Sequence, residues 1–424
     1  MRTIVPGLHR ILLTTIYLVA LGVAGGLVWQ TIQAMRSWPM QQNNAPAPIV
    51  LIATPTTEPT PAPLLTLPTT IAPPLPTLTP ELAAEPVSYH PKTGRYIVAW
   101  LPANMSEGAM ASFEANKDVI DDVSPFWYAT TGNGQLYGTR NDDLVRLAHS
   151  YNIRVIPSIH NVTANPNAIV PVLRNPQIRA RHIQNIVDEV LARNYDGIDI
   201  DYEGLDASLR EPFSTFMRDL ATALRLHGKV LTVAVHAKGS DYGGLGGYQD
   251  WAELGKHVDQ LRIMTYDYHW RGSSPGPVAP AYWIAEVAEY ARSVVEPSKV
   301  LLGVHFYGYD WPANGRATPL SWGTIEELIN EQGLTVNFVE RNALGRVEES
   351  TFSYRSGNGM RTVWFMTKTG LASKIKTVQA YDLAGIAIWQ LGYEKPEYWE
   401  AIREEIVQDP SLIQRAINPL IPDH

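Results

Sequence analysis

The sequence predicts an α/β protein whose main part, residues 87–424, is a (β/α)8 TIM barrel. Short apolar or β-branched runs recur along this part of the chain, and stretches with helical periodicity separate them. Strands that alternate with helices indicate parallel βαβ units, because a parallel crossover needs a connection of about helix length. Eight units in about 320 residues fit a barrel with insertions. A doubly wound open sheet is the alternative.

The strands are expected where short runs are richest in branched and aromatic residues. The helices between them each show one apolar face. The eight expected strands are Tyr96–Leu101, Val123–Tyr128, Arg154–Ile159, Gly197–Tyr202, Val230–Val235, Gln260–Thr265, Val300–Phe306 and Gly385–Gln390. The clearest apolar faces are Ile183, Ile186, Val187, Val190 and Leu191 in one helix, and Phe213, Phe216, Met217, Leu220 and Leu224 in the next.

The gap before the eighth strand, from Gly308 to Ala384, is too long for a loop and one helix. We therefore expect a small α+β insertion at about residues 310–366, between strands seven and eight. Its expected elements are a helix near Thr324–Glu331 and extended pieces around Phe352–Tyr354 and Thr362–Phe365, followed by the barrel helix Lys368–Ala380.

Residues 11–32 are predicted to form a transmembrane signal anchor. No charged side chain occurs from Ile11 to Met35, and the apolar stretch 11–29 would span about 28 Å as a helix. A cleaved signal peptide is the alternative, but its apolar region is usually shorter and a small-x-small site follows it. The residues at the end of the apolar run, Leu27-Val28-Trp29-Gln30, make a poor cleavage site.

The charges around this segment predict its orientation. Arg2 and Arg10 precede it, and only Arg36 follows closely. This bias places residues 1–10 in the cytoplasm and the rest of the chain outside. We therefore expect a single-pass protein of the cell membrane with an extracytoplasmic barrel, or a secreted one if the anchor is cut.

Residues 33–86 are predicted to be a disordered linker. Positions 37–86 hold 13 Pro, nine Thr and only three charged residues. Each Pro removes a backbone donor, so regular helix or sheet is unfavourable and a stiff, polyproline-like spacer is expected.

Composition narrows the function classes. The formal net charge is −8, which argues against a nucleic-acid partner, since phosphate binders carry a basic excess. The chain has no Cys, which excludes a disulfide scaffold, a thiol nucleophile and Cys-ligated metal sites. No cofactor motif is present, and no cofactor is expected.

The fourth expected strand carries a row of acids. In a strand, alternate residues share a face, so Asp199, Asp201 and Glu203 lie together, opposite Ile198 and Ile200. Carboxyl groups this close cannot all ionise freely, and the row climbs toward the strand end where barrel enzymes keep their sites. The alternation with Ile argues against an exposed edge strand, because the Ile side chains need a buried face. We find no His ligands nearby for a metal, although carboxylates alone can bind Mg²⁺ or Ca²⁺. We interpret the row as catalytic.

These residues resemble a known family. Asp196-x-x-Asp199-x-Asp201-x-Glu203 is similar to the DxxDxDxE signature of glycoside hydrolase family 18, the chitinase-like enzymes. Met264-Thr265-Tyr266-Asp267 resembles the sixth-strand motif of this family, and Trp389 its eighth-strand Trp. The resemblance covers roughly residues 93–405. One departure is Ser158-Ile159-His160-Asn161, where typical chitinases have SxGG. The segments after strands six and seven, 266–270 and 307–311, resemble a bacterial branch of spore-germination and cortex-lytic peptidoglycan glucosaminidases.

The resemblance implies a role for each acid. Glu203 would be the general acid and base, and Asp201 would orient the substrate's acetamido group. Asp199 would share a proton with Asp201, and Tyr266 would align the acetamido oxygen for attack. Asp196, on the other face of the strand, is expected to be structural, as is its neighbour Gly197.

Other polar and aromatic residues are candidates for binding sugar. Asp267 and Asn161 are candidate partners of sugar hydroxyls, and Trp389 is a candidate floor under a sugar ring. Four further residues either line the cleft or belong to the core. They are His160 and His236, at the ends of strands three and five, and Trp100 and Trp127, at the ends of strands one and two.

The implied function is retaining hydrolysis of β-1,4 bonds next to N-acetylglucosamine through an oxazolinium ion, a known exception to the two-carboxylate mechanism. Peptidoglycan is favoured as the substrate by the departure at His160-Asn161 and by the membrane tether. Chitin or its oligosaccharides are the first alternative, and a non-catalytic glycan-binding barrel is the second.

Overall fold

The computed structural model describes residues 90–161, 165–241, 244–338, 349–357 and 359–407. The predicted anchor at 11–32 and the linker at 33–86 lie outside these residues and stay predictions. Within the described residues, no helix has both the length and the apolar character needed to span a bilayer.

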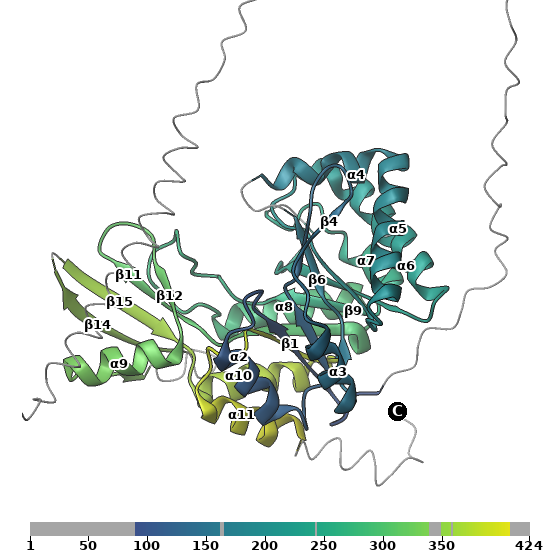
Figure 1. Cartoon of the computed structure of the whole chain (residues 1–424). Coiled ribbons are helices and arrows are strands. Elements are labelled where there is room, and N and C mark those ends of the chain that lie inside the picture. Colours follow the sequence, from purple (N-terminus) through teal and green to yellow (C-terminus); the bar gives the residue numbers. More distant parts are fainter. Residues whose placement is uncertain (1–89, 162–164, 242–243, 339–348, 358, 408–424) are drawn as a thin grey trace, which may run out of the picture. The chain divides into compact units, whose positions relative to one another are not determined.

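A curled, mostly parallel sheet forms the centre of the fold (Figure 1). Its order is β4-β3-β6-β7-β8-β9-β10-β16-β1-β2-β5. Backbone bonds from Asp196 N to Val155 O and from Asp199 N to Pro157 O join β7 to the third barrel strand, which consists of β5 and β6. This is the connectivity of a (β/α)8 barrel. The strands of this sheet are β1 (Tyr96–Leu101), β2 (Asp122–Pro125), β3 (Tyr128–Thr130), β4 (Leu136–Gly138), β5 (Arg154–Val155), β6 (Ser158–Asn161), β7 (Gly197–Asp201), β8 (Val230–His236), β9 (Gln260–Met264), β10 (Val300–His305) and β16 (Gly385–Trp389).

Two of the expected strands are broken in the structure. The expected strand at 123–128 is divided into β2 and β3, and the one at 154–159 into β5 and β6. Pro125 and Pro157 lie at these breaks, and proline cannot donate a bond to the ladder. The breaks let β2 pair with β1 and β5, while β3 pairs with β6 and, in a hairpin, with β4.

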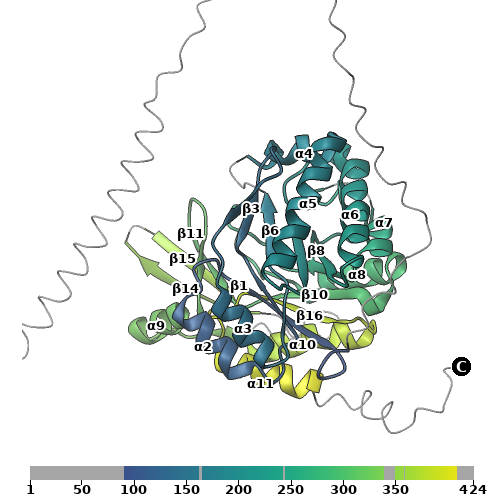
Figure 2. The same ribbon diagram turned by 45° about the vertical axis from the view of Figure 1, so that its right-hand side comes forward.

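Helices cover the outer face of the sheet (Figure 2). The residue Asn175 caps α5 by accepting bonds from Gln177 N and Ile178 N, and Pro176 occupies the first turn, where no donor is needed. The predicted apolar face of α6 is buried, whereas Leu191 of α5, which was expected to be buried, is exposed. The helices are α2 (Glu107–Asn116), α3 (Asp142–Ser150), α4 (Val170–Arg174), α5 (Pro176–Ala192), α6 (Arg210–Arg225), α7 (Trp251–His257), α8 (Ala281–Val294), α9 (Trp322–Gln332), α10 (Lys368–Ala380) and α11 (Pro396–Ile402).

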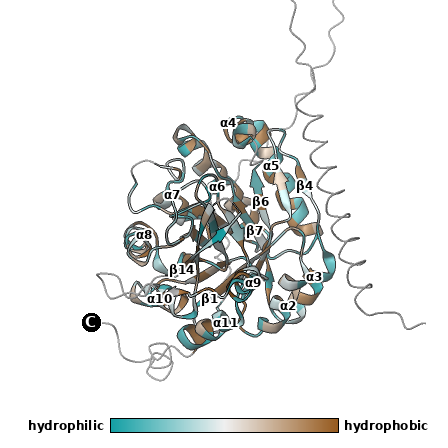
Figure 3. Cartoon of the chain, turned by 90° about the vertical axis from the view of Figure 1, so that its left-hand side faces the viewer, coloured by the Kyte–Doolittle hydropathy of each residue, from teal (hydrophilic) through white to brown (hydrophobic). Residues whose placement is uncertain are grey.

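The core lies between the sheet and this helical layer, where apolar side chains from both form one large cluster. Figure 3 shows helices α8 and α11 with both hydrophilic and hydrophobic colours, as expected for helices with one face in water.

A small α+β insertion interrupts the barrel between β10 and α10, and it projects to one side of the sheet (Figure 1). It is a five-stranded antiparallel sheet with α9 packed against it around Ile325, Phe352 and Phe365. Its strands are β11 (Gly308–Pro312), β12 (Thr318–Leu320), β13 (Asn337–Phe338), β14 (Ser350–Ser356) and β15 (Gly359–Phe365).

Candidate active site

The strand β7 carries the acidic row into the interior of the sheet. Gly197 starts the strand, and a Cβ added there would lie 2.2 Å from the carbonyl oxygen of Val230, so only glycine allows β7 and β8 to pair this closely. Asp199 is fully buried and Asp201 is 6% exposed. The carboxyl groups therefore lie inside the sheet, as the alternation along the strand predicts.

Asp199 is held by donors from three other strands. Its carboxyl accepts bonds from Trp100 Nε1 at 3.0 Å, Ser158 Oγ at 2.8 Å and Thr232 Oγ1 at 2.5 Å. The guanidinium of Arg262 lies 3.6 Å from its Oδ1. These contacts offset the cost of burying the carboxylate.

The contact to Asp199 changes the interpretation of Trp100. Its side chain is 2% exposed and belongs to the core behind the acidic row, so it has no free face for a sugar ring. Trp127 is likewise buried, against Tyr195. The expectation that Trp100 binds sugar is therefore corrected, and Trp127 takes the core alternative.

A buried polar layer supports the acidic row, and sequence reasoning missed it. Arg262 is fully buried, donates to Ser124 Oγ and Gln260 Oε1, and lies 3.4 Å from Asp122 Oδ2. Asp122 also accepts two bonds from Arg154. The only signal in the sequence is the presence of charged residues within strands. It does not identify their partners, which lie up to 140 positions away.

Asp201 differs from Asp199 in its surroundings. Its Oδ1 is buried and has no hydrogen-bond partner. Burial, followed by the charges of Glu203 and Asp199, raises the pKa of Asp201 well above its usual range. A neutral Asp201 relieves the repulsion between neighbouring carboxyl groups of this row.

Glu203 follows the end of β7 and reaches the rim of the sheet. Its side chain is 41% exposed, and burial, followed by the charge of Asp267, raises the pKa of its carboxyl. A carboxyl with a raised pKa holds its proton to a higher pH than a free Glu does, which suits general acid catalysis.

The backbone of Glu203 is fixed by Asn161. The amide of Asn161 accepts from Glu203 N at 2.9 Å and donates to Glu203 O at 2.8 Å, and it also donates to Pro166 O at 3.2 Å. Asn161 is 2% exposed, so its amide is occupied and inaccessible. The expectation that Asn161 binds sugar hydroxyls is therefore corrected: it is a positioning residue for Glu203.

Two histidines lie near the rim. The residue His236 ends β8, and its Nε2 lies 3.7 Å from Glu203 Oε2 and has no hydrogen-bond partner. Burial lowers the pKa of His236 to about 4, so the ring is neutral at neutral pH. The ring of His160 stacks on Phe126, with ring centres 4.6 Å apart, and Phe126 in turn contacts Trp389.

The segment after β9 brings Tyr266 and Asp267 to the same end. Burial raises the pKa of Tyr266 well above its usual range, and the negative charges of Asp201, Glu203 and Asp267 raise it further. Asp267 accepts hydrogen bonds from the hydroxyls of Tyr307 and Tyr309, at 3.2 Å for Tyr309. The motif around these two tyrosines was recognised in the sequence, but their contact with Asp267 was not.

Aromatic rings form the wall beside these acids. The half-buried Trp389 at the end of β16 meets Trp100 edge-on, with ring centres 6.1 Å apart. Trp389 and Tyr266 pack on a cluster of buried side chains from the segment after β9 and from β11 and its flanking residues. Its members are Val278, Tyr307, Tyr309, Trp311 and Ala317.

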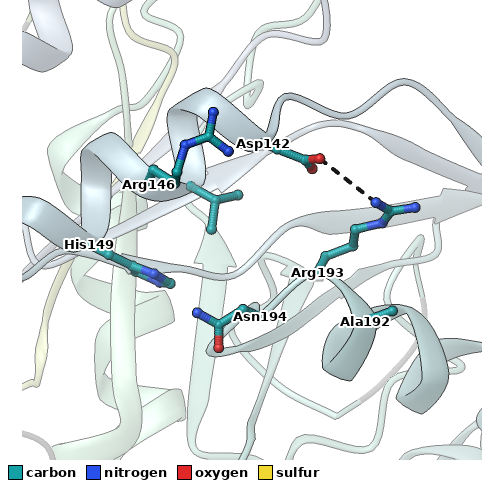
Figure 4. A pocket seen from close by; sticks show the side chains of 7 residues that line it. Asp142, Arg146, His149, Ala192, Arg193 and Asn194 are labelled. Atoms are coloured by element: carbon teal, nitrogen blue, oxygen red, sulfur yellow. Dashed lines mark ion pairs between the residues drawn. The ribbon is translucent and has the colours of Figure 1, made fainter.

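Asp196 lies at the other end of β7. Its Oδ2 accepts bonds from the backbone N–H of Val155 and from His149 Nε2, both at 2.8 Å, which is a structural contact. A cavity of about 250 Å³ opens nearby and is lined by Asp142, Val145, Arg146, His149, Ala192, Arg193 and Asn194 (Figure 4). It lies at the amino ends of the strands, whereas barrel enzymes react substrates at the carboxyl ends.

Across the described part of the chain, no group of three or more His, Asp or Glu side chains is arranged to hold a metal ion. Asp199 and Asp196 instead contact polar side chains and a backbone N–H group. The arrangement offers a proton donor with a raised pKa, a buried carboxyl with a free oxygen and an aromatic wall, which suit acid catalysis on a bound sugar.

Comparisons with known proteins agree with this geometry. The profile of glycosyl hydrolases family 18 matches residues 97–394. The putative sporulation-specific glycosylase YdhD of Bacillus subtilis is 32% identical over 310 residues, which are 69% of this chain and 72% of that protein. The cortical fragment-lytic enzyme of Bacillus anthracis is 26% identical over 59% of each chain. The crystal structure of a chitinase from Chromobacterium violaceum superposes with a TM-score of 0.68 at 26% identity, over 74% of this chain and 99% of that one.

The family is characterised by a (β/α)8 barrel, which is the connectivity observed here, and the matched residues include every acid described above. The chain therefore belongs to glycosyl hydrolases family 18 and is a glycosidase.

Proposed function

We propose that this protein is a retaining hydrolase that cleaves β-1,4 bonds next to N-acetylglucosamine in peptidoglycan, and that the substrate's own acetamido group is the nucleophile. The observation that carries the proposal is the combination of Glu203, a half-exposed acid with a raised pKa just beyond β7, with the buried and unpartnered oxygen of Asp201 at the end of β7.

In the first step, Glu203 transfers its proton to the glycosidic oxygen as the bond between that oxygen and the anomeric carbon breaks. The carbonyl oxygen of the acetamido group attacks the anomeric carbon, and a cyclic oxazolinium ion forms. No protein carboxylate needs to bond to the sugar, which is the recognised exception among retaining enzymes. Tyr266 donates to the attacking oxygen and aligns it.

Asp201 and Asp199 act together during this step. The free Oδ1 of Asp201 would accept the acetamido N–H and stabilise the positive charge that develops on the ring. As Asp201 becomes ionised, its proton is shared with Asp199, whose donors from Trp100, Ser158 and Thr232 keep it in place.

In the second step, Glu203, now ionised, takes a proton from water as that water attacks the anomeric carbon from the side that the leaving group vacated. The oxazolinium ring opens and the product retains the original configuration. Asn161 holds the Glu203 backbone in both steps, and Trp389 would form the floor under the reacting sugar.

Peptidoglycan is proposed over chitin on two grounds. The relatives described above include a cortical fragment-lytic enzyme and a putative sporulation-specific glycosylase. The segment Ser158-Ile159-His160-Asn161 also departs from the usual chitinase motif. The two departing residues have contacts of their own: Asn161 holds Glu203, and His160 stacks on Phe126. Chitin is the second candidate, favoured by the structural similarity to a chitinase. We further propose that the predicted anchor at 11–32 tethers the enzyme to the outside of the cell membrane, close to such a substrate.

The test is to incubate the full-length protein with purified peptidoglycan and with chitin oligosaccharides, to identify the products by mass spectrometry, and to follow their initial anomeric configuration by proton NMR. We expect muramyl-containing fragments with N-acetylglucosamine at the new reducing end, in the β-configuration immediately after cleavage. Products from chitin alone would reject the proposed substrate, and an initial α-anomer would reject the retaining mechanism.

A matched variant, Glu203→Gln, has nearly the same shape but no transferable proton. We expect it to lose cleavage of both substrates and to keep glycan binding. Unchanged turnover would reject Glu203 as the acid.

A further inference from the structure

The loop that follows the catalytic segment after β9 carries an exposed aromatic ring stacked with a cation. Trp270 is 48% exposed, and the guanidinium carbon of Arg316 lies 5.8 Å from the centre of its ring. Tyr268, two residues earlier, is also exposed. Large exposed aromatic side chains beside an active site are a common means of holding sugars, because a sugar ring presents an apolar face.

This loop is held in a defined shape. Tyr268 N donates to Val278 O at 2.8 Å, His269 contacts Ser274 O at 3.0 Å, and Trp270 N donates to Ser273 Oγ at 3.0 Å. A Cβ added at Gly272 would lie 2.4 Å from the ring of Trp270, so the backbone passes directly against the indole.

The far end of the loop is fixed by Glu349. Its buried carboxylate accepts bonds from the backbone N–H groups of Val278 and Ala279 and pairs with Lys374. Trp270 is therefore presented by a preorganised loop, which lowers the entropy cost of binding a ligand.

The loop is joined to the catalytic end of the barrel by the insertion. Arg271 and Ala317 form two hydrogen bonds with each other, from Ala317 N to Arg271 O at 2.8 Å and from Arg271 Nε to Ala317 O at 3.0 Å. Ala317 packs in the same cluster as Tyr309, whose hydroxyl donates to Asp267. Trp270 and Arg316 therefore lie at the outer edge of this aromatic cluster. Tyr309, at its inner edge, contacts Asp267.

The charge of this edge is unusual for the protein. The formal net charge is −8, yet Arg271 and Arg316 are both exposed, and in the described part of the chain neither has a carboxylate within ion-pair distance. Two guanidinium groups without acidic partners beside an exposed indole match a sugar that carries a carboxylate, since guanidinium binds carboxylate in a planar, two-point contact.

We propose that Trp270 and Arg316 form a subsite for a carboxylate-bearing amino sugar, the N-acetylmuramic acid unit of peptidoglycan. The sugar ring packs on the exposed part of the Trp270 ring that Arg316 and Gly272 leave open, and its lactyl carboxylate pairs with Arg316. The inference rests on the proposed function and deepens it, because it identifies the group that distinguishes peptidoglycan from uncharged chitin at this edge of the site.

The test uses the full-length Glu203→Gln protein, so that ligands bind without being cleaved. Three tetrasaccharides are titrated by calorimetry at low salt: one with alternating N-acetylglucosamine and N-acetylmuramic acid and free carboxylates, the same compound as its methyl ester, and chitotetraose. We expect the free acid to bind more tightly than its ester, and the difference to shrink at high salt because the contact is exposed.

Adding Arg316→Gln should weaken binding of the free acid about three- to tenfold, as expected for one exposed charge pair, and change the ester less than twofold. Trp270→Ala should weaken all three ligands. The matched control is Arg292→Gln, an exposed arginine in the last turn of α8, near the amino ends of the strands. It should leave all three affinities unchanged.

Equal weakening of acid and ester by Arg316→Gln would overturn the proposal, as would no weakening at all. The proposed function fails separately, if the unmodified enzyme cleaves chitotetraose but not the muramyl tetrasaccharide. The comparison of acid with ester still decides the role of Arg316 in that case, because it measures binding.

Discussion

Replacing Asn161 by Ala tests whether this residue positions Glu203 or binds sugar. The substitution removes three hydrogen bonds, two to the Glu203 backbone and one to Pro166 O. Glu203 lies beyond the end of β7, so the strand ladder does not replace them. At about 1–3 kcal/mol for each backbone group of Glu203 left unpaired, and toward the lower end because water can enter at the rim, we expect a loss of about 2–4 kcal/mol of stability.

The kinetic consequence follows from the geometry. If the Glu203 backbone relaxes by about 1 Å, its proton is no longer aligned with the glycosidic oxygen, and a misplacement of that size costs on the order of 10²-fold in rate. We therefore expect kcat of Asn161→Ala to fall about 10²-fold, while KM changes less than about threefold.

The assay is steady-state kinetics on a soluble glycan substrate, together with a thermal melt to confirm folding. Asn161→Asp keeps the acceptor for Glu203 N but loses the donor to Glu203 O, so it should be intermediate in stability. The control is Asn185→Ala, which removes a comparable bond, to Gly134 O at 2.8 Å, without touching Glu203. A raised KM with an unchanged kcat in Asn161→Ala would refute the reasoning and restore Asn161 as a sugar ligand.

The other predictions concern the acids and their supports. Asp201→Asn should lower kcat by a factor of about 10² or more, because a positioned electrostatic group is lost, and an effect below tenfold would contradict its role. Burial raises the pKa of Glu203 most and the charge of Asp267 raises it next, so activity that needs protonated Glu203 is present below that pKa and lost as the pH rises through it. Asp267→Asn should therefore move the alkaline limb of the kcat/KM profile to lower pH, and an unmoved limb would argue against this coupling. Trp100→Phe removes a donor from the buried carboxylate of Asp199 and should cost about 1–3 kcal/mol of stability, measured as a lower Tm; an unchanged Tm would show that another donor replaces it.

The sequence predicted the acidic row because its evidence is local. Side chains alternate along any strand, so the spacing of Asp199, Asp201 and Glu203 places them on one face whatever surrounds them. The same holds for the barrel helix at 368–380, which occupies its expected range. The position of Gly197 could also be recognised, although the reason for it, the carbonyl of Val230, belongs to the neighbouring strand.

The roles of Asn161 and Trp100 could not be predicted in this way. Each has polar atoms that suit either a ligand or a protein partner, and a strand pattern does not say which partner will be near. The aromatic residues after β10 gave the same difficulty. The motif at 307–311 was visible, but the bonds of Tyr307 and Tyr309 to Asp267 cross some 40 positions.

The chain alone therefore determined the strand periods, the acidic face of β7 and the family, because these depend on neighbours in sequence. Tertiary structure decided which groups hold those acids. Trp100 reaches Asp199 across 99 positions and Asn161 reaches Glu203 across 42, and only the order and register of the strands bring such pairs within hydrogen-bond distance.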